Sequence, residues 1–201
     1  MIANPPALFI DTETTGLDPY SCRLVELACV LVNPDASVDV WDTLIRPVDF
    51  AIPWDAERIH GISNEEAHST GIPLQLALAE LTSLALRARP GWVIGHNLRY
   101  DLTVLGSEYK RAESKLYPLN HLTPFCTMVA LTERMGLPGK YGKYKWPRLD
   151  EAYRYCLGED RPLGTHRALS DALACKAIYD HGVAQQWWHG SREVDSTEPQ
   201  E

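Results

Sequence analysis

Asp11 and Glu13 are two acidic residues separated by a single threonine, and they follow a short apolar run at residues 7–10. In an extended strand, side chains two residues apart point to the same face. Two carboxylates held side by side repel each other unless a cation or a proton lies between them. The turn-forming residues 14–16 place the pair at the end of the strand, where a sheet opens to ligands. The pair therefore predicts a metal site, and the simpler alternative is a solvated strand end.

Asp101 is a third acid whose position indicates burial. Apolar residues at positions 98, 102, 105 and 109 form a stripe along a predicted helix over residues 98–111. Asp101 borders that stripe, where an unpaired carboxylate would cost several kcal/mol. The alternative is a helix cap, for which Asn97 is better placed because Asp101 is already inside the helix.

Asp171 repeats the pattern on a predicted helix over residues 167–184, whose apolar stripe is at positions 168, 172, 175 and 179. The alanines beside Asp171 allow the helix to approach the sheet closely. The alternative is an exposed ion-pair partner of Lys176, which faces elsewhere on the helix.

His166 precedes Asp171 by five residues, which on one continuous helix would separate the two side chains by about 140°. Gly164 and Thr165 are typical of a helix start, so we expect His166 at or just before the first turn, leaning over the site. Imidazole, with an unperturbed pKa of about 6.5, can accept a proton from water near neutral pH. The alternative is an ordinary surface histidine.

Together these residues form a set of four carboxylates and one histidine. Ligation by oxygen alone selects hard cations such as Mg²⁺ or Mn²⁺ over zinc. Two such ions about 4 Å apart stabilise both the attacking and the leaving oxygen of an in-line phosphoryl displacement. The sequence therefore predicts two divalent cations and hydrolysis of a phosphodiester.

The elements that must position these residues form an α/β pattern, with strands first and then alternating helices and strands. A turn cluster at residues 33–37 indicates a hairpin between the second and third strands. The expected strands are residues 7–13, 24–32, 38–45, 92–95 and a short one after Pro124; the expected helices are 73–88, 98–111, 127–135, 149–156 and 167–184. We expect a mixed sheet covered by helices in one domain over residues 1–188, followed by a polar, disordered tail over residues 189–201.

Composition limits the class of protein. The chain has 201 residues, 45% of them hydrophobic, which suits one soluble domain. No apolar run approaches the roughly 20 residues of a membrane span, and the N-terminus carries no secretory signal pattern. The five cysteines show no CxxC spacing, so neither a zinc site nor a disulfide framework is expected, and a reducing cytoplasm is the predicted location.

The net charge of −8 argues against a protein that coats nucleic acid non-specifically. The tail, however, carries −3 of that charge and the rest of the chain −5. Two bound divalent cations would nearly cancel the latter, so the charge does not exclude a nucleic-acid substrate.

Three segments carry a family resemblance. They are Phe9-Ile10-Asp11-Thr12-Glu13-Thr14-Thr15-Gly16-Leu17, Gly95-His96-Asn97-Leu98-Arg99-Tyr100-Asp101 and His166-Arg167-Ala168-Leu169-Ser170-Asp171-Ala172. Their order and separation resemble the DEDDh 3′→5′ exonucleases, a DnaQ-like family that includes the proofreading subunit of bacterial DNA polymerase III and RNase T. The weaker segment 58–62 also fits, and the resemblance spans roughly residues 7–180. It implies an RNase H-like fold with a mixed five-stranded sheet flanked by helices. The histidine five residues before Asp171 indicates the histidine branch, and residues 14–16 look closest to the proofreading subunits.

The resemblance also implies roles. Asp11, Glu13 and Asp171 would hold the ion that activates water, Asp11 and Asp101 would hold the second ion, and His166 would be the general base. The substrate would be the 3′ end of single-stranded DNA or RNA, released as nucleoside 5′-monophosphates.

Six further residues would contact the substrate by the same resemblance. The backbone around Thr12 and Thr14 would meet the terminal 3′-hydroxyl, and Leu17 would wedge against the terminal bases. His96 and Asn97 would lie near the scissile phosphate, and Tyr100 would stack on or flank a base. For His96, Asn97 and Tyr100 a core or capping role is an equal alternative.

Residues 134–148 contain five basic residues and no acid, with three aromatic residues interleaved. Lys140, Lys143 and Lys145 could neutralise phosphates while the aromatic rings stack on bases, at about 1–3 kcal/mol per base. We expect this loop to guide a single strand; the alternative is a solvated surface loop. A polymerase or other protein partner is a further hypothesis, with residues 185–188 and the acidic tail as its docking site.

Two other functions fit the same fold. A non-catalytic nucleic-acid-binding module would have no need of the five chemical positions, all of which are present. An RNase H-like enzyme that cuts internally would generally lack both the Asp-x-Glu beginning and the His-x4-Asp end. The sequence therefore favours an exonuclease.

Overall fold

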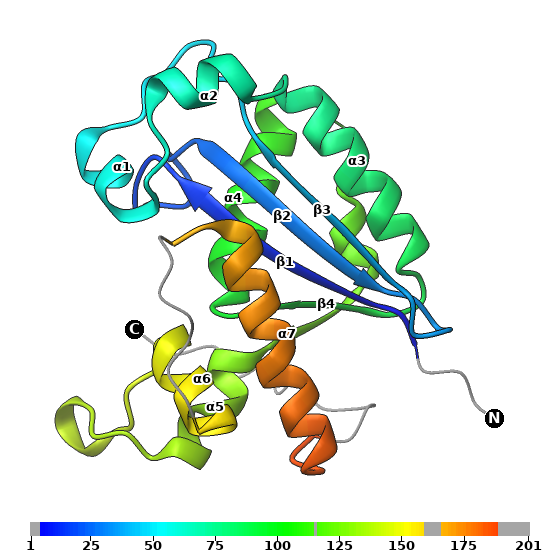
Figure 1. Ribbon diagram of the computed structural model, residues 1–201, viewed down its shortest axis with the longest axis vertical. Helices are drawn as coiled ribbons and strands as arrows, with labels where there is room; N and C mark the ends of the chain where they lie inside the picture. Colours follow the sequence, from blue (N-terminus) through cyan, green and yellow to red (C-terminus); the bar gives the residue numbers. More distant parts are fainter. Residues whose placement is uncertain (1–4, 115, 159–165, 189–201) are drawn as a thin grey trace.

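The computed structural model describes residues 5–114, 116–158 and 166–188. Within these ranges the chain forms a sheet of five strands in the order β3-β2-β1-β4-β5. β2 is antiparallel to both β1 and β3, whereas β4 runs parallel to both β1 and β5 (Figure 1). The strands are β1 (Ala7–Thr14), β2 (Leu24–Val32), β3 (Val38–Leu44), β4 (Trp92–Gly95) and β5 (Thr123–Cys126). The predicted mixed five-stranded sheet is confirmed.

The hydrophobic pattern of β2 explains why this strand is covered on both faces. β2 reads LVELACVLV and is buried over almost its whole length, as expected for a strand with helices on either side. The predicted hairpin between β2 and β3 closes with a hydrogen bond from the Asn33 amide to the Ser37 carbonyl, 2.9 Å long. Ala36 adopts the left-handed conformation that this turn requires.

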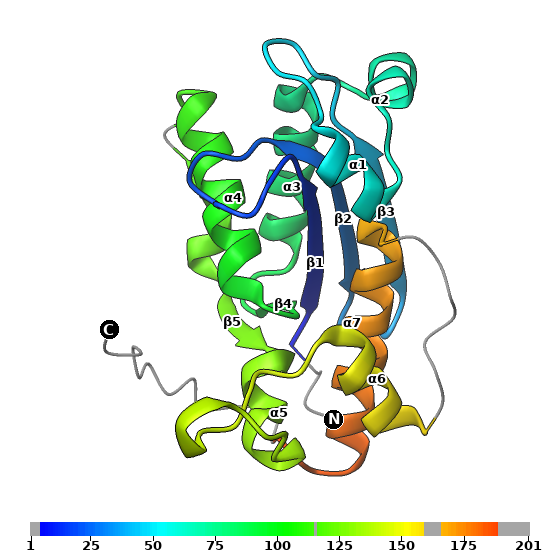
Figure 2. The same ribbon diagram turned by 90° about the vertical axis from the view of Figure 1, so that its left-hand side faces the viewer.

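The alternation along β1 divides the core into two layers. Leu8 and Ile10 pack with α3 (Leu74–Arg87) and α4 (Leu98–Arg111) on one face of the sheet. Phe9 packs with the first turns of α7 (Ala168–Ala184) on the other face. Figures 1 and 2 show the same layering, with the sheet between α7 and the pair α3 and α4. Because Asp11 and Glu13 share the parity of Phe9, they face α7.

Two short helices were not predicted from the sequence. They are α1 (Trp54–His60) and α2 (Asn64–Thr70), which lie beyond the C-terminal end of β1 (Figure 1). Gly61 ends α1 in the left-handed conformation, and the Ser63 hydroxyl caps α2 by accepting from the Glu66 amide. The Ser-x-x-Glu spacing at Ser63 was the usable signal for α2.

The remaining helices precede or follow β5, the edge strand of the sheet, along the chain. They are α5 (Thr127–Met135), α6 (Leu149–Leu157) and the 3-10 helices η1 (Pro118–His121) and η2 (Lys140–Gly142). Trp187 and Trp188 pack against the apolar cluster between α5, α6 and α7, so these rings contribute to the core of the chain itself.

The predicted tail over residues 189–201 and the predicted helix start at Gly164 and Thr165 lie outside the described residues. No helix in the described part of the chain is long and apolar enough to cross a membrane.

Candidate active site

Three of the predicted carboxylates meet between the end of β1 and the first turn of α7. Asp11, Glu13 and Asp171 each offer an oxygen, and these oxygens lie within 4.8 Å of one another. Small residues make this approach possible, because Ala168 and Ala172 pack directly on the sheet. The strand alternation and the helical phase used in the sequence analysis therefore bring these three side chains together.

The electrostatics of this cluster favour an added positive charge. The pKa of Glu13 is raised from 4.5 to about 8, first by burial and then by the nearby carboxylates of Asp171, Glu26 and Asp101; Arg167 lowers it. A carboxyl group that keeps its proton to this pH lies in a place where a cation could replace the proton. The donors are all oxygen atoms, so the cluster fits a hard divalent cation.

Asp101 lies close by but on the α4 side of the sheet. It is only 3% exposed, and its Oδ1 accepts a hydrogen bond of 2.7 Å from the Thr12 hydroxyl. Burial raises its pKa to about 7, and Asp171 adds to the shift, while the bond from Thr12 opposes it. Asp101 thus belongs to the same electrostatic site without joining the three-oxygen cluster. Thr12 bonds to Asp101 through both its side chain and its backbone.

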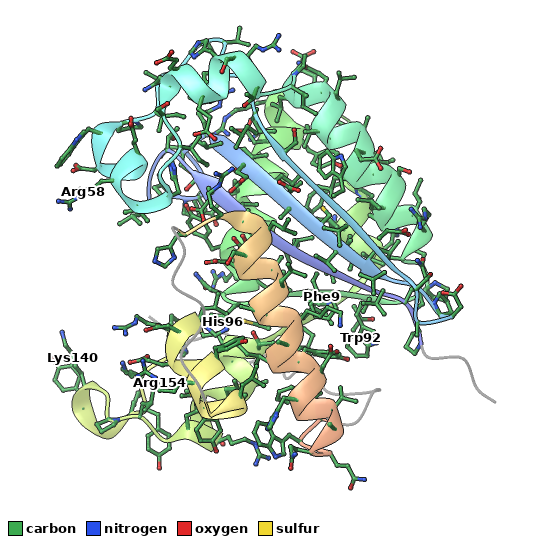
Figure 3. All side chains as sticks on the ribbon, in the orientation of Figure 1. Phe9, Arg58, Trp92, His96, Lys140 and Arg154 are labelled. Carbon is green, nitrogen blue, oxygen red and sulfur yellow. The ribbon has the colours of Figure 1, made fainter. Side chains whose placement is uncertain are left out.

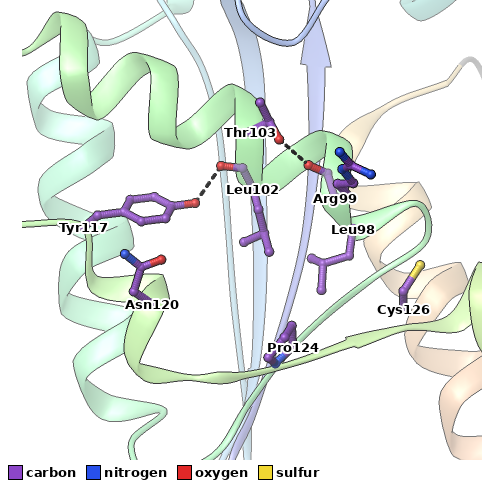
Figure 4. A pocket seen from close by; sticks show the side chains of 8 residues that line it. All are labelled: Leu98, Arg99, Leu102, Thr103, Tyr117, Asn120, Pro124 and Cys126. Atoms are coloured by element: carbon purple, nitrogen blue, oxygen red, sulfur yellow. Dashed lines mark hydrogen bonds between the residues drawn. The ribbon is translucent and has the colours of Figure 1, made fainter. Parts of the chain in front are cut away.

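The buried face of α4 differs slightly from the apolar stripe predicted from the sequence. Its buried face includes Val104, Asp101 and Glu108, whereas Leu102 is only partly buried. The reason is that Leu102 lines a cavity of about 460 Å³ between α4, η1 and β5 (Figure 4). Asp101 therefore lies within the buried face rather than at its border. None of the five predicted catalytic residues lines this cavity.

His166 lies immediately before α7, as predicted. Its Nδ1 is 3.5 Å from Asp171 Oδ2, and its side chain is 64% exposed. The imidazole therefore stands at the solvent edge of the carboxylate cluster.

His96 and Asn97 lie at the end of β4, where α4 begins. The Nε2 of His96 is 3.0 Å from the Pro147 carbonyl and its Nδ1 is 2.9 Å from the Thr127 hydroxyl. A carbonyl can only accept, so Nε2 is the protonated nitrogen. Burial lowers the pKa of His96, which keeps the ring neutral. The residue is partly buried and both ring nitrogens bond to the protein, consistent with the core role that the sequence left open. Asn97 occupies the N-cap position in a left-handed conformation without a side-chain capping bond.

Tyr100 holds the loop that follows β1. Its hydroxyl donates to the Gly16 carbonyl and contacts the Thr14 hydroxyl, both at 2.6 Å, and burial raises its pKa. Leu17 projects from this anchored loop and is 88% exposed. The structure thus brings Tyr100, Thr14 and Leu17 together at the end of β1.

The predicted basic loop is a small hairpin, which we call the basic hairpin (residues 137–145). The Lys145 amide donates to the Leu137 carbonyl at 3.0 Å, and Tyr141 at the tip is 98% exposed. The Lys145 ammonium forms an ion pair with Glu151 at 2.6 Å. Lys140 and Lys143 have no ion pair within the described residues, and Lys140 points away from the body of the molecule (Figure 3).

One buried acid near the site escaped the sequence analysis. Glu26 lies directly opposite Glu13 in the register of β1 and β2 and is 1% exposed. The sequence did contain an indication of this site, because Glu26 is the one charged residue in the apolar strand β2. Such a residue is seldom buried without a partner.

Comparison with known proteins agrees with this geometry. A model of the family described as "Exonuclease" matches residues 8–179. "Uncharacterized exonuclease CP81" of Escherichia phage 186 is 31% identical over 179 residues, which are 86% of each chain. "DNA polymerase III subunit epsilon" of Rickettsia felis is 30% identical over 177 residues, which cover 86% of this chain and 71% of the relative.

Solved structures confirm the fold. "Exonuclease I (apo)" superposes with a TM-score of 0.71 at 21% identity, covering 89% of this chain and 42% of that one. E. coli Exonuclease I in complex with a dT13 oligonucleotide gives a TM-score of 0.74 at 21% identity, covering 90% of this chain and 41% of that one. This chain thus spans about two fifths of those structures and shares their RNase H-like fold. With its sheet, its carboxylate cluster and a family match over residues 8–179, the chain belongs to the DnaQ-like exonuclease family.

Proposed function

We propose that the chain is a metal-dependent 3′→5′ exonuclease of the DEDDh type, with its catalytic domain in residues 1–188. It would release nucleoside 5′-monophosphates from the 3′ end of a single strand. The observation that carries the proposal is the meeting of Asp11, Glu13 and Asp171 within 4.8 Å, with His166 at 3.5 Å from Asp171. Membership of the exonuclease family supports the choice of reaction.

The carboxylates divide into two sets of metal ligands in this proposal. Asp11, Glu13 and Asp171 would hold one cation, and Asp11 and Asp101 would hold the other. When bound, two Mg²⁺ or Mn²⁺ ions supply an acidified water and charge stabilisation for the attacking and leaving oxygens. The raised pKa values of Glu13 and Asp101 support metal binding at this site, because a nearby cation would favour the ionised form of both groups.

His166 would act as the general base. Its Nδ1 faces Asp171, which leaves Nε2 to take the proton from the attacking water. The carboxylate of Asp171 stabilises the imidazolium that results. Because the ring is mostly exposed, it can pass the proton to solvent and return to its neutral form.

The loop after β1 would hold the terminal nucleotide. The backbone of Thr12 and Thr14 would meet the 3′-hydroxyl, and Leu17 would wedge against the last base. The bonds from Tyr100 to Thr14 and Gly16 keep this loop in place, so Tyr100 flanks the nucleotide site by supporting it.

The scissile phosphate would lie beside the start of α4. Asn97 can reach it, since its side chain makes no capping bond there. His96 would support this place from beneath, by tying β4 to Pro147.

The basic hairpin would guide the strand toward the site. Lys140 and Lys143 offer unpaired ammonium groups within the described residues, and Tyr141 offers an exposed ring. Lys145 contributes less charge, because Glu151 already neutralises it. Single-stranded DNA is the first substrate to test, since Exonuclease I binds a dT13 oligonucleotide on the same fold. The relatives named as a polymerase subunit make a polymerase a candidate protein partner.

The proposal is tested with linear and circular forms of one single-stranded DNA in Mg²⁺ or Mn²⁺. We expect the linear form to be degraded to mononucleotides and the circular form to survive. Cleavage of the circle would instead indicate an internal-cutting nuclease. Binding of both forms without turnover would indicate a non-catalytic binding module.

A further inference from the structure

Glu26 is a buried carboxylate whose two oxygens both accept hydrogen bonds. Its Oε1 accepts hydrogen bonds from Arg167 Nε at 2.9 Å and Nη2 at 2.6 Å. Its Oε2 accepts from the Ala168 amide at 2.8 Å. A carboxylate from the middle of the sheet thus reaches across to the first residues of α7.

These bonds fix the start of α7 in two ways. Arg167 is the N-cap residue of α7, and the Ala168 amide is one of the N–H groups that a helix leaves unpaired at its beginning. The planar guanidinium gives two donors in fixed directions, which restrains orientation as well as distance. A further contact of 3.7 Å joins Arg167 Nη1 to Glu66.

The residue that gains from this restraint is His166, which directly precedes Arg167. The body of α7 is held by packing of Ala168, Ala172 and Cys175 on the sheet, and Asp171 shares that support. His166 is mostly exposed, and within the described residues its one polar contact is with Asp171 at 3.5 Å. A rotation of the backbone at Arg167 would therefore move the imidazole before it moved Asp171.

A purely stabilising role explains the pair poorly. Buried ion pairs are often no more stable than apolar residues of similar volume. Stability alone therefore does not account for the pair, whereas geometric control of the neighbouring residue does.

We propose that Glu26 and Arg167 form a clamp that positions His166 for proton transfer. This inference rests on the proposed function, in which His166 is the general base. Glu26 and Arg167 are positioning residues, because neither needs to touch the substrate.

The test combines single and double variants with a metal-binding control. In Arg167→Lys, which keeps the charge but loses the fork, and in Glu26→Gln, kcat should fall about 10- to 100-fold while KM changes less than about twofold. Mn²⁺ affinity, measured by calorimetry, should stay within about twofold. Lys176→Ala, which removes an ion pair further along the same helix, should retain full activity.

The background of His166→Ala gives the sharper readout. If the clamp acts through the imidazole, adding Arg167→Lys to His166→Ala should lower kcat less than about twofold further. Losses that multiply in the double variant, or a wild-type kcat in both Arg167→Lys and Glu26→Gln, would overturn the clamp and leave the proposed function standing. Should Glu26→Gln fail to fold, Arg167→Lys decides alone. A wild-type protein without metal-dependent turnover would remove the proposed function and the clamp together.

Discussion

At the scale of single residues, the chemistry of the site follows from how Glu13 is surrounded. Its neighbours on the α7 face are Asp11 and Asp171, and Glu26 lies opposite it on β2. Burial and the nearby carboxylates make the ionisation of Glu13 costly. A divalent cation removes that cost, so the arrangement links metal binding to the charge of one side chain.

Glu13→Gln should therefore weaken metal binding without lowering the thermal stability of the metal-free protein. Losing a ligand should weaken Mn²⁺ binding at least tenfold and abolish turnover. In EDTA at pH 8 the variant should melt no lower than the wild type, because it lacks the buried charge. Calorimetry and thermal melts measure the two effects, with the exposed Glu65→Gln as a control that changes neither. A large loss of stability in EDTA would contradict this account of Glu13.

Sequence spacing was enough to find the residues that share one element. Asp11 and Glu13 follow from strand alternation, and Asp171 from helical phase. The Glu26–Arg167 pair could not be found that way, since it depends on the register between β1 and β2 and on where α7 crosses the sheet. The engagement of His96 with Pro147 is likewise non-local.

At the scale of elements, two helical glycines differ in what surrounds them. A Cβ at Gly182 in α7 would overlap the ring of Trp188, whereas a Cβ at Gly106 in α4 would meet only Tyr117 at 3.9 Å. Glycine inside a helix costs about 1 kcal/mol relative to alanine. Whether replacing a glycine by alanine raises or lowers the free energy of unfolding should thus depend on how close the neighbouring aromatic ring lies.

We expect Gly106→Ala to stabilise the protein by up to about 1 kcal/mol and Gly182→Ala to destabilise it by about 1–3 kcal/mol. Urea unfolding measures both. In the background of Trp188→Ala the penalty at Gly182 should disappear. The same stabilisation at both glycines would show that Trp188 does not pack on α7.

The basic hairpin makes a prediction about salt. In the inactive background of Asp11→Ala, the double change Lys140→Ala and Lys143→Ala should reduce the slope of log affinity for single-stranded DNA against log salt by about 1.4, since each phosphate contact contributes about 0.7. Lys110→Ala, an exposed lysine at the end of α4, should leave the slope unchanged. An unchanged slope in the double variant would mean that the hairpin does not touch the strand.

Elements with long periodic patterns were predicted within a few residues, as were the short strands β4 and β5, whereas the short helices α1 and α2 were not. α1 and α2 have seven residues each, so neither shows a clear stripe. Their positions depend on the apolar cluster around Ile52 and Ile62 beneath them, which only the folded chain reveals.

At the scale of the whole molecule, the acidic site links stability to pH. The folded chain holds the Glu13 proton to about pH 8 and the Asp101 proton to about pH 7, whereas the ordinary values are 4.5 and 3.8. Between these limits the folded state binds more protons than the unfolded state, so stability falls as the pH rises.

The metal-free protein should accordingly melt lower at pH 8 than at pH 5.5, by at least the 2–4 °C that about 1 kcal/mol represents for a chain of this size. Added Mn²⁺ should raise the melting temperature more at pH 8 than at pH 5.5, because cation and proton compete for the same oxygens. Scanning calorimetry in EDTA and in Mn²⁺ measures both trends, and Glu13→Gln should weaken them. A melting temperature that rises with pH in EDTA would contradict the assigned burial.

The fold class and the meeting of the three carboxylates were thus predictable because both depend on local periodicity and motif order. The net charge of −8 predicted little by itself, because its meaning depends on where the acids lie, and three of them meet at one place. The path of a nucleic-acid strand over the surface would depend on the exposure of Tyr141 and on the ion pair of Lys145 with Glu151. Composition reveals neither.

The central claim is that the carboxylate cluster removes nucleotides from a 3′ end. It is tested most directly by following a 5′-labelled single-stranded oligonucleotide with the wild type and Asp11→Ala, in Mg²⁺, Mn²⁺ or EDTA. We predict a ladder that shortens from the 3′ end in either metal and is absent in EDTA and in the variant. Release of the labelled 5′ nucleotide first, or the same ladder from Asp11→Ala, would contradict the account.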